Sequence, residues 1–182
     1  LKIFNMRTFY AIIMLFATPT LVAPTPPPGL SENIIEEPKV EVKDQNKFLH
    51  DIGFRESGNR YTIVNQFGYM GKYQFGKSTL RTLKIKVTKD AFLNSPDLQE
   101  YAMQQNLIYN KKKLLKYIKL YEGETIHGIF ITESGILAAA HLAGPGSVRK
   151  FFRRGSEFKD GFGTSMTSYL EEFSGYELNI NL

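Results

Sequence analysis

The sequence predicts a mainly α-helical domain with one small β-hairpin. Helix-capping residues precede long apolar-periodic stretches, as at Ser95 and Thr132. A short glycine-containing loop, residues 66–68, separates two segments rich in β-branched and aromatic residues. With 182 residues, of which 42% are hydrophobic, the chain is long enough for one domain with its own core.

The first predicted helix begins at Asn46. Phe48, Ile52 and Glu56 follow at intervals of four residues and therefore share one face of this helix. The Ser-Gly-Asn sequence at residues 57–59 ends the helix. We therefore expect the Glu56 carboxyl group at the end of the face that enters the core.

The segments 60–65 and 69–75 are predicted as the two strands of the hairpin. A short helix is predicted over residues 77–83, and a long one after Ser95, with Pro96 and Asp97 in its first turn and Gly123 as its end. The pattern allows a break in this long helix near Asn110.

Thr132 is the predicted N-cap of the next helix, whose small residues between positions 135 and 143 favour close helix packing. The Gly-Pro-Gly sequence at residues 144–146 is expected to break this helix, with Ser147 capping a further one. Residues 165–176 are predicted as the last helix. The phenylalanines of the basic stretch 149–154 have helical spacing and are expected in the core.

The N-terminal part of the sequence has the pattern of an export signal. Residues 6–23 contain a basic residue, a short apolar run and then small residues. We expect residues 1–23 to be a cleaved signal or an N-terminal anchor, which would associate the protein with a membrane. Residues 24–46, rich in proline and acids, are predicted as a linker, and residues 47–182 as the functional domain.

The composition limits the chemistry and the partners. The absence of cysteine excludes disulfides, thiolate zinc sites and cysteine nucleophiles. His50 and His127 lack a partner pattern, so no metal site and no cofactor are predicted. The net charge of +5 is typical of a protein with a polyanionic partner (nucleic acid, anionic lipid or an acidic cell-wall polymer), although an ordinary solvated surface is the simpler interpretation of the same charge. An exported protein is not expected to bind nucleic acid.

Glu56 is the strongest candidate for a chemical role. It is the single carboxylate in the stretch 54–80, which also contains four glycines. A protonated Glu among apolar residues, beside backbone that a sugar chain can approach closely, is typical of the general acid of a glycosidase. The simpler interpretation of Glu56 is a surface glutamate at a helix end. Its position on the apolar face of the helix favours the catalytic interpretation.

The stretch "ESGNRYTIVNQFGYMGKYQFGKSTL" (residues 56–80) resembles the Glu-Ser … Gly-x-x-Gln-x-x-x-x-Thr signature of lytic transglycosylases, a family of the lysozyme-like superfamily. Glu56 and Ser57, then Gly71 and Gln74, then Thr79 occupy its positions. The stretch "AHLAGPGSV" (residues 140–148) is similar to the family's Ala-Tyr-Asn-Ala-Gly block, and Tyr169 to its late tyrosine.

This resemblance implies a lysozyme-like (α+β) fold, and Glu56 as both general acid and base. Cleavage of the β-1,4 bond between N-acetylmuramic acid and N-acetylglucosamine would then leave a 1,6-anhydro end. The resemblance implies substrate binding by residues in all three blocks: Ser57, Gly71, Tyr73, Gln74, His141 and Tyr169. His141 and Leu142 stand where the family has Tyr-Asn, and Tyr73 where it has Met.

Simpler interpretations stay open for several of these residues. Ser57 could only satisfy backbone groups, Gln74 could be a polar residue at a strand end, and His141 and Tyr169 could pack in the core. The implied protein is an exported monomer, periplasmic, membrane-anchored or secreted, that acts on the glycan strands of peptidoglycan.

Two other functions stay open as well. A muramidase-type hydrolase of the same fold would need a second carboxylate to activate water, for which Asp51, Asp90 and Asp160 are candidates. The other is a cell-wall-binding module that keeps the same fold but has no catalytic activity.

Overall fold

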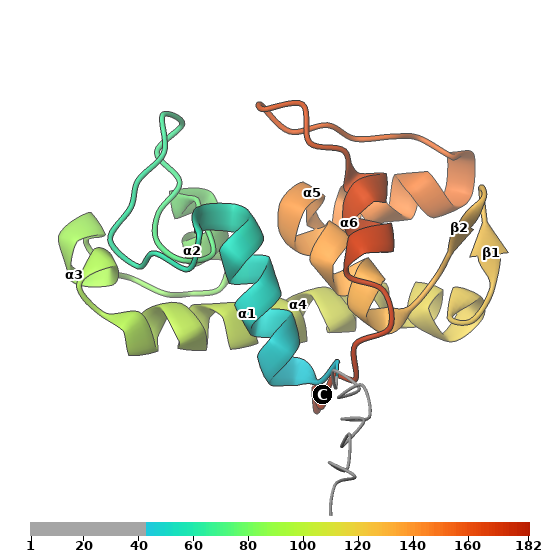
Figure 1. Ribbon diagram of the computed structural model, residues 1–182, viewed down its shortest axis with the longest axis horizontal. Coiled ribbons are helices and arrows are strands. Elements are labelled where there is room, and N and C mark those ends of the chain that lie inside the picture. Colours follow the sequence, from blue (N-terminus) through green and yellow to red (C-terminus); the bar gives the residue numbers. More distant parts are fainter. Residues whose placement is uncertain (1–42) are drawn as a thin grey trace, which may run out of the picture. The chain divides into compact units, whose positions relative to one another are not determined.

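The computed structural model describes residues 43–182, which are mainly helical, as predicted. Within this part of the chain there are six helices and one two-stranded antiparallel sheet (Figure 1). The helices are α1 (Gln45–Ser57), α2 (Lys77–Thr82), α3 (Lys89–Leu93), α4 (Pro96–Tyr121), α5 (Glu133–Arg154) and α6 (Met166–Glu172); the strands are β1 (Thr125–Ile126) and β2 (Ile129–Phe130).

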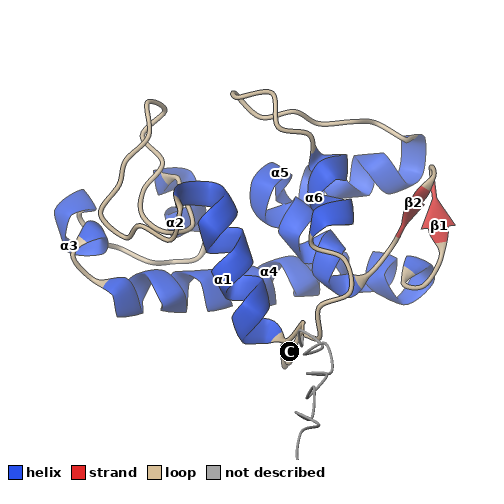
Figure 2. Ribbon diagram, viewed as in Figure 1, coloured by secondary structure: helices blue, strands red, loops and turns tan. Residues whose placement is uncertain are grey.

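Helix α4 runs along the domain, and α1 crosses it near the middle of the view (Figure 1). Helices α2 and α3 lie toward one end of α4, whereas α5, α6 and the small sheet lie toward the other (Figure 2). One core joins these parts, since Phe48 and Ile52 of α1 are fully buried together with Leu137 of α5. The catalytic candidate Glu56 thus belongs to a helix that is fixed on its apolar side.

The predicted helix starts are confirmed by capping hydrogen bonds. The Ser95 side chain accepts a hydrogen bond from the backbone N–H of Leu98, and Thr132 accepts one from Gly135. Helix α4 continues through Asn110 without interruption. Phe151 and Phe152 are buried, as expected from their spacing.

The folded domain begins slightly before the predicted boundary at Asn46. Asp44 caps α1 by accepting a hydrogen bond from Lys47 N at 2.8 Å, and Lys43 O accepts one from Glu177 N at 2.7 Å. The last residues of the predicted linker are therefore part of the domain. The predicted export segment and the rest of the linker lie outside the described residues.

The two strands predicted for residues 60–65 and 69–75 do not form. Val64 and Met70 make one isolated antiparallel bridge, and Met70 makes another with Phe75. Regular pairing stops because the chain turns at Gly71 (φ 75°) and again at Gln74 (φ 49°), both in the left-handed region. The described sheet instead comprises β1 and β2, two residues each, which the sequence analysis did not predict.

Helix α5 contains the break predicted at the Gly-Pro-Gly sequence. Gly144 has a non-helical backbone (φ 75°, ψ 157°), and the helix continues after it. The second segment is already helical at Pro145, so Ser147 lies inside it and is not its N-cap. The break ends the first segment shortly after His141, at the edge of the cavity described below.

The small residues of α5 allow the close approach of α6. A Cβ atom added at Gly135 would collide with the carbonyl oxygen of Leu170. The neighbouring residue in α6 is Tyr169, whose side chain is 2% exposed. The Gly135 contact therefore helps to place Tyr169.

We expect Gly135→Ala to lower the free energy of unfolding by about 1–3 kcal/mol, because the backbone of α6 must move. Thermal or urea unfolding measures this loss. Gly146→Ala is the matched control in the same helix, since its added Cβ would meet nothing within 4 Å. That variant should be neutral or slightly stabilised. An equal loss in both variants would contradict the packing role of Gly135.

None of the helices within residues 43–182 is long and apolar enough to cross a membrane. The same residues contain no group of three or more His, Cys, Asp or Glu side chains that could hold a metal ion.

Candidate active site

A cavity of about 700 Å³ lies beside the C-terminal end of α1. Its walls come from α1, residues 65–83, α4, the break in α5, the loop 158–164 and α6. The volume is in the range of pockets that bind small molecules or a few sugar units. Four of the predicted site residues line it: Glu56, Gln74, His141 and Tyr169.

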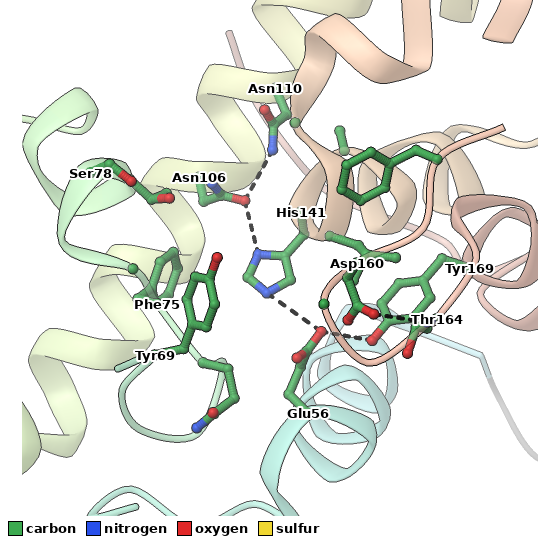
Figure 3. Close-up of a pocket in the computed structure, with 18 of the residues that line it drawn as sticks. Glu56, Tyr69, Phe75, Ser78, Asn106, Asn110, His141, Asp160, Thr164 and Tyr169 are labelled. Carbon is green, nitrogen blue, oxygen red and sulfur yellow. Dashed lines mark hydrogen bonds and ion pairs between the residues drawn. The ribbon is translucent and has the colours of Figure 1, made fainter. Parts of the chain in front are cut away.

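Glu56 lies between Tyr169 and His141 (Figure 3). Its side chain is only 14% exposed, and its Oε1 accepts a hydrogen bond of 2.7 Å from the Tyr169 hydroxyl. Burial raises the pKa of the Tyr169 hydroxyl, and the adjacent Glu56 raises it further, so the tyrosine is a permanent donor. Tyr169 fixes one carboxyl oxygen, and the group faces the cavity.

His141 connects three parts of the site. Its Nε2 lies 3.0 Å from the carbonyl oxygen of Tyr73 and 3.9 Å from Glu56 Oε1, and its Nδ1 lies 3.3 Å from Asn106 Oδ1. The ring is 6% exposed and packs edge-on against Phe75. His141 therefore has polar atoms near both ring nitrogens in addition to its packing contact with Phe75.

Asn106 and Asn110 are two further residues of the site that were not predicted from the sequence. Both are buried in α4, and Asn110 Nδ2 donates to Asn106 Oδ1 at 3.0 Å. This pair supports His141 from the side opposite Glu56, as the chain of dashed lines in Figure 3 shows. Two asparagines four residues apart on the apolar face of a long helix are a signal that could have identified them.

Gln74 lines the cavity, but part of its hydrogen-bonding capacity is already used. Its Nε2 donates to the carbonyl oxygen of Gly71 at 2.8 Å. This bond closes the turn in which Gln74 itself has a positive φ. The same bond leaves the amide oxygen of Gln74 unused.

Ser57 and Gly71 do not line the cavity. The buried Ser57 hydroxyl donates to the carbonyl oxygen of Lys72 at 2.8 Å and accepts from Arg60 N at 3.0 Å, so it ties α1 to the 71–75 turn. An added Cβ at Gly71 would collide with the Gln99 side chain. The contacts of both residues therefore stabilise the fold around the site, and neither residue faces the cavity.

Tyr73 is fully buried, and its side chain points away from the cavity residues to Glu100. Glu100 accepts hydrogen bonds from Tyr73 at 2.6 Å, Tyr61 at 2.7 Å and Lys72 at 2.8 Å. Burial acts to raise the pKa of Glu100, but these three bonds outweigh it and hold the pKa below its usual value. Tyr73 reaches the site through its carbonyl oxygen, which faces His141.

A second carboxylate, Asp160, lines the same cavity. Its Oδ1 accepts hydrogen bonds from Phe162 N at 2.9 Å and Thr164 N at 2.8 Å, so it holds its own loop together. Asp51 and Asp90 do not line the cavity. Asp51 instead accepts bonds from Lys47 and Tyr176 on another face of α1.

Comparisons of this chain with known protein families, with curated proteins and with solved structures found no match.

Proposed function

We propose that this protein is an exported, lysozyme-like enzyme that cleaves the glycan strands of peptidoglycan by the lytic transglycosylase reaction. The observation that carries the proposal is the position of Glu56. Its carboxyl group is nearly buried, faces a cavity of about 700 Å³ and has one oxygen held by Tyr169. A positioned carboxyl group of this kind is what a general acid requires.

The proposed reaction uses Glu56 twice. Its carboxyl group first donates a proton to the oxygen that links N-acetylmuramic acid to N-acetylglucosamine, and the bond from C1 to that oxygen breaks. The carboxylate then takes the proton of the muramic acid 6-hydroxyl, whose oxygen forms the new bond to C1. The first proton stays on the released N-acetylglucosamine hydroxyl and the second leaves Glu56 protonated again, so no water is consumed and the product is a 1,6-anhydro ring.

The surrounding residues support this assignment. Because Oε1 accepts from Tyr169, we assign the proton transfers to Oε2. His141 Nε2 lies 3.9 Å from the same Oε1 atom. The amide groups of Gln74 and Asn106 lie in the cavity wall. Such amides can form hydrogen bonds with the N-acetyl groups and hydroxyls of the sugars.

Incubation of the full chain with purified peptidoglycan sacculi tests the proposal. We expect the release of soluble muropeptides, measured by chromatography and mass spectrometry. An absence of released fragments, with folded protein present, would contradict the proposal.

The position of Asp160 in the cavity wall supports hydrolysis as the second candidate reaction. A hydrolase would use this carboxylate to activate a water molecule on the opposite face of the sugar. We favour the transglycosylase because Asp160 already accepts two backbone N–H groups of its own loop, which is a structural use.

Asp160→Asn separates the two reactions, because the amide oxygen of Asn can still accept both N–H groups while the charge is lost. We expect this variant to keep most of the muropeptide release. A loss of about 100- to 10,000-fold, as expected for the removal of a catalytic base, would support the hydrolase instead. The midpoint of thermal unfolding of this variant shows whether the loop 158–164 keeps its structure.

A further inference from the structure

Two surface phenylalanines contact each other at the edge of the cavity. Phe67 and Phe162 are 52% and 58% exposed, yet their ring centroids are 4.8 Å apart at an interplanar angle of 72°. Both residues line the cavity that contains Glu56. Paired aromatic rings that remain exposed beside a cavity are typical of a ligand-binding surface.

Both rings are placed by the same local arrangement. Asn65 Oδ1 accepts hydrogen bonds from Phe67 N at 2.9 Å and Tyr69 N at 3.1 Å. Asp160 Oδ1 accepts in the same way from Phe162 N and Thr164 N. In each loop a side-chain oxygen thus fixes the backbone that presents the ring.

The two loops come from distant parts of the chain. One joins α1 to α2, the other joins α5 to α6, and both project from the same side of the domain (Figure 1). They meet at the ring pair and at Gly161, where an added Cβ would lie 3.0 Å from the Phe67 ring. The contact therefore bridges two walls of one cavity.

We infer that Phe67 and Phe162 form a clasp that closes over a bound linear polysaccharide and stacks on one of its sugar rings. The inference rests on the proposed function and adds to it a binding site for the strand. The axial C–H groups of a β-linked sugar ring make an apolar face, which an exposed aromatic ring can cover and shield from water. A polysaccharide strand that is held beneath the clasp dissociates slowly from the protein.

Alanine substitution tests the clasp. The probe is a soluble β-1,4-linked oligomer of N-acetylglucosamine, which has the backbone of the glycan without its stem peptides. In the Glu56→Gln background, where cleavage is blocked, Phe67→Ala with Phe162→Ala should weaken binding about tenfold or more, through faster dissociation. Titration calorimetry and surface-based kinetics measure both quantities.

Phe130→Ala is the matched control. Phe130 lies in β2, is 56% exposed and does not line the cavity. Removal of this ring subtracts a similar exposed surface from the protein, so binding should be unchanged. An equal effect of Phe130→Ala and of the clasp substitutions would contradict a specific role for the clasp.

Chemical cross-linking provides a second test, because the chain has no cysteine of its own. Thiols introduced by Phe67→Cys and Phe162→Cys can be joined by a short bismaleimide while the oligosaccharide is bound. We expect the oligosaccharide to dissociate more slowly from the cross-linked protein than from the same variant without the reagent. An unchanged dissociation rate would contradict a strand that passes beneath the clasp.

The outcomes separate the two proposals. If the wild-type protein releases muropeptides while the alanine substitutions leave oligosaccharide binding unchanged, the clasp is wrong and the proposed function stands. If the wild-type protein neither binds the oligosaccharide nor releases muropeptides, both are wrong. Weaker binding of the alanine variant together with a slower release from the cross-linked one supports the clasp.

Discussion

Glu56→Gln is expected to reduce the release of muropeptides from peptidoglycan by about 100- to 10,000-fold. The amide keeps the shape of the carboxyl group, and its oxygen can still accept the 2.7 Å hydrogen bond from Tyr169. It can neither donate the proton to the glycosidic oxygen nor accept one afterwards. Initial rates of fragment release at equal protein concentration give the size of the loss.

The matched control for this substitution is Glu172→Gln. Glu172 is 44% exposed and lies 3.6 Å from the guanidinium of Arg55, the residue next to Glu56. Loss of this surface ion pair should leave the rate unchanged. Glu56→Gln activity equal to that of the wild type would show that Glu56 is not the general acid. Retained binding of sacculi by Glu56→Gln would show that the loss concerns chemistry.

Tyr169→Phe has the second-largest expected effect on the reaction, a fall in kcat of about 10- to 100-fold. The substitution removes the hydroxyl that holds Glu56 Oε1, and a hydrogen bond to the charge that develops on this carboxyl group as it gives up its proton is worth about 1.5–3 kcal/mol. Because Tyr169 acts through Glu56, we expect kcat to fall while KM changes little. Steady-state kinetics on a soluble peptidoglycan fragment separate the two constants.

Tyr176→Phe controls for the loss of a partly buried tyrosine–carboxylate bond. The Tyr176 hydroxyl donates to Asp51 Oδ2 at 2.7 Å, the same length as the bond of Tyr169 to Glu56, but neither residue lines the large cavity. This variant should lose some stability and keep its kcat. A rise in KM with constant kcat in Tyr169→Phe would instead indicate that Tyr169 contacts the sugar.

The sequence predicts most of the helices because their signals are local. Ser95 and Thr132 cap their helices through bonds to residues three positions away, and the spacing of Phe48, Ile52 and Glu56 defines one face of α1. The same spacing correctly predicts that Phe48 and Ile52 are buried. Glu56 is nearly buried at the end of this face, as expected from its spacing, and lines the cavity.

The remaining features depend on contacts between distant segments. The 60–75 segment has the residues of a hairpin, but Glu100 in α4 holds the Tyr73 side chain, and a Cβ added at Gly71 would collide with the Gln99 side chain of the same helix. The contact of Phe67 with Phe162 joins two loops that no local pattern connects. His141 could be singled out from the sequence, but its proximity to Glu56 depends on how the fold brings together two residues that are far apart in the sequence.

The measurement that tests the central claim most directly is the fate of water oxygen during cleavage. Peptidoglycan is digested by the wild-type protein in heavy-oxygen water, and the new glycan ends are analysed by mass spectrometry. If Glu56 works alone as acid and base, the new muramic acid ends are 1,6-anhydro rings without the heavy oxygen, lighter by one water molecule than reducing ends. Reducing ends that carry the heavy oxygen would contradict this account and identify the protein as a hydrolase.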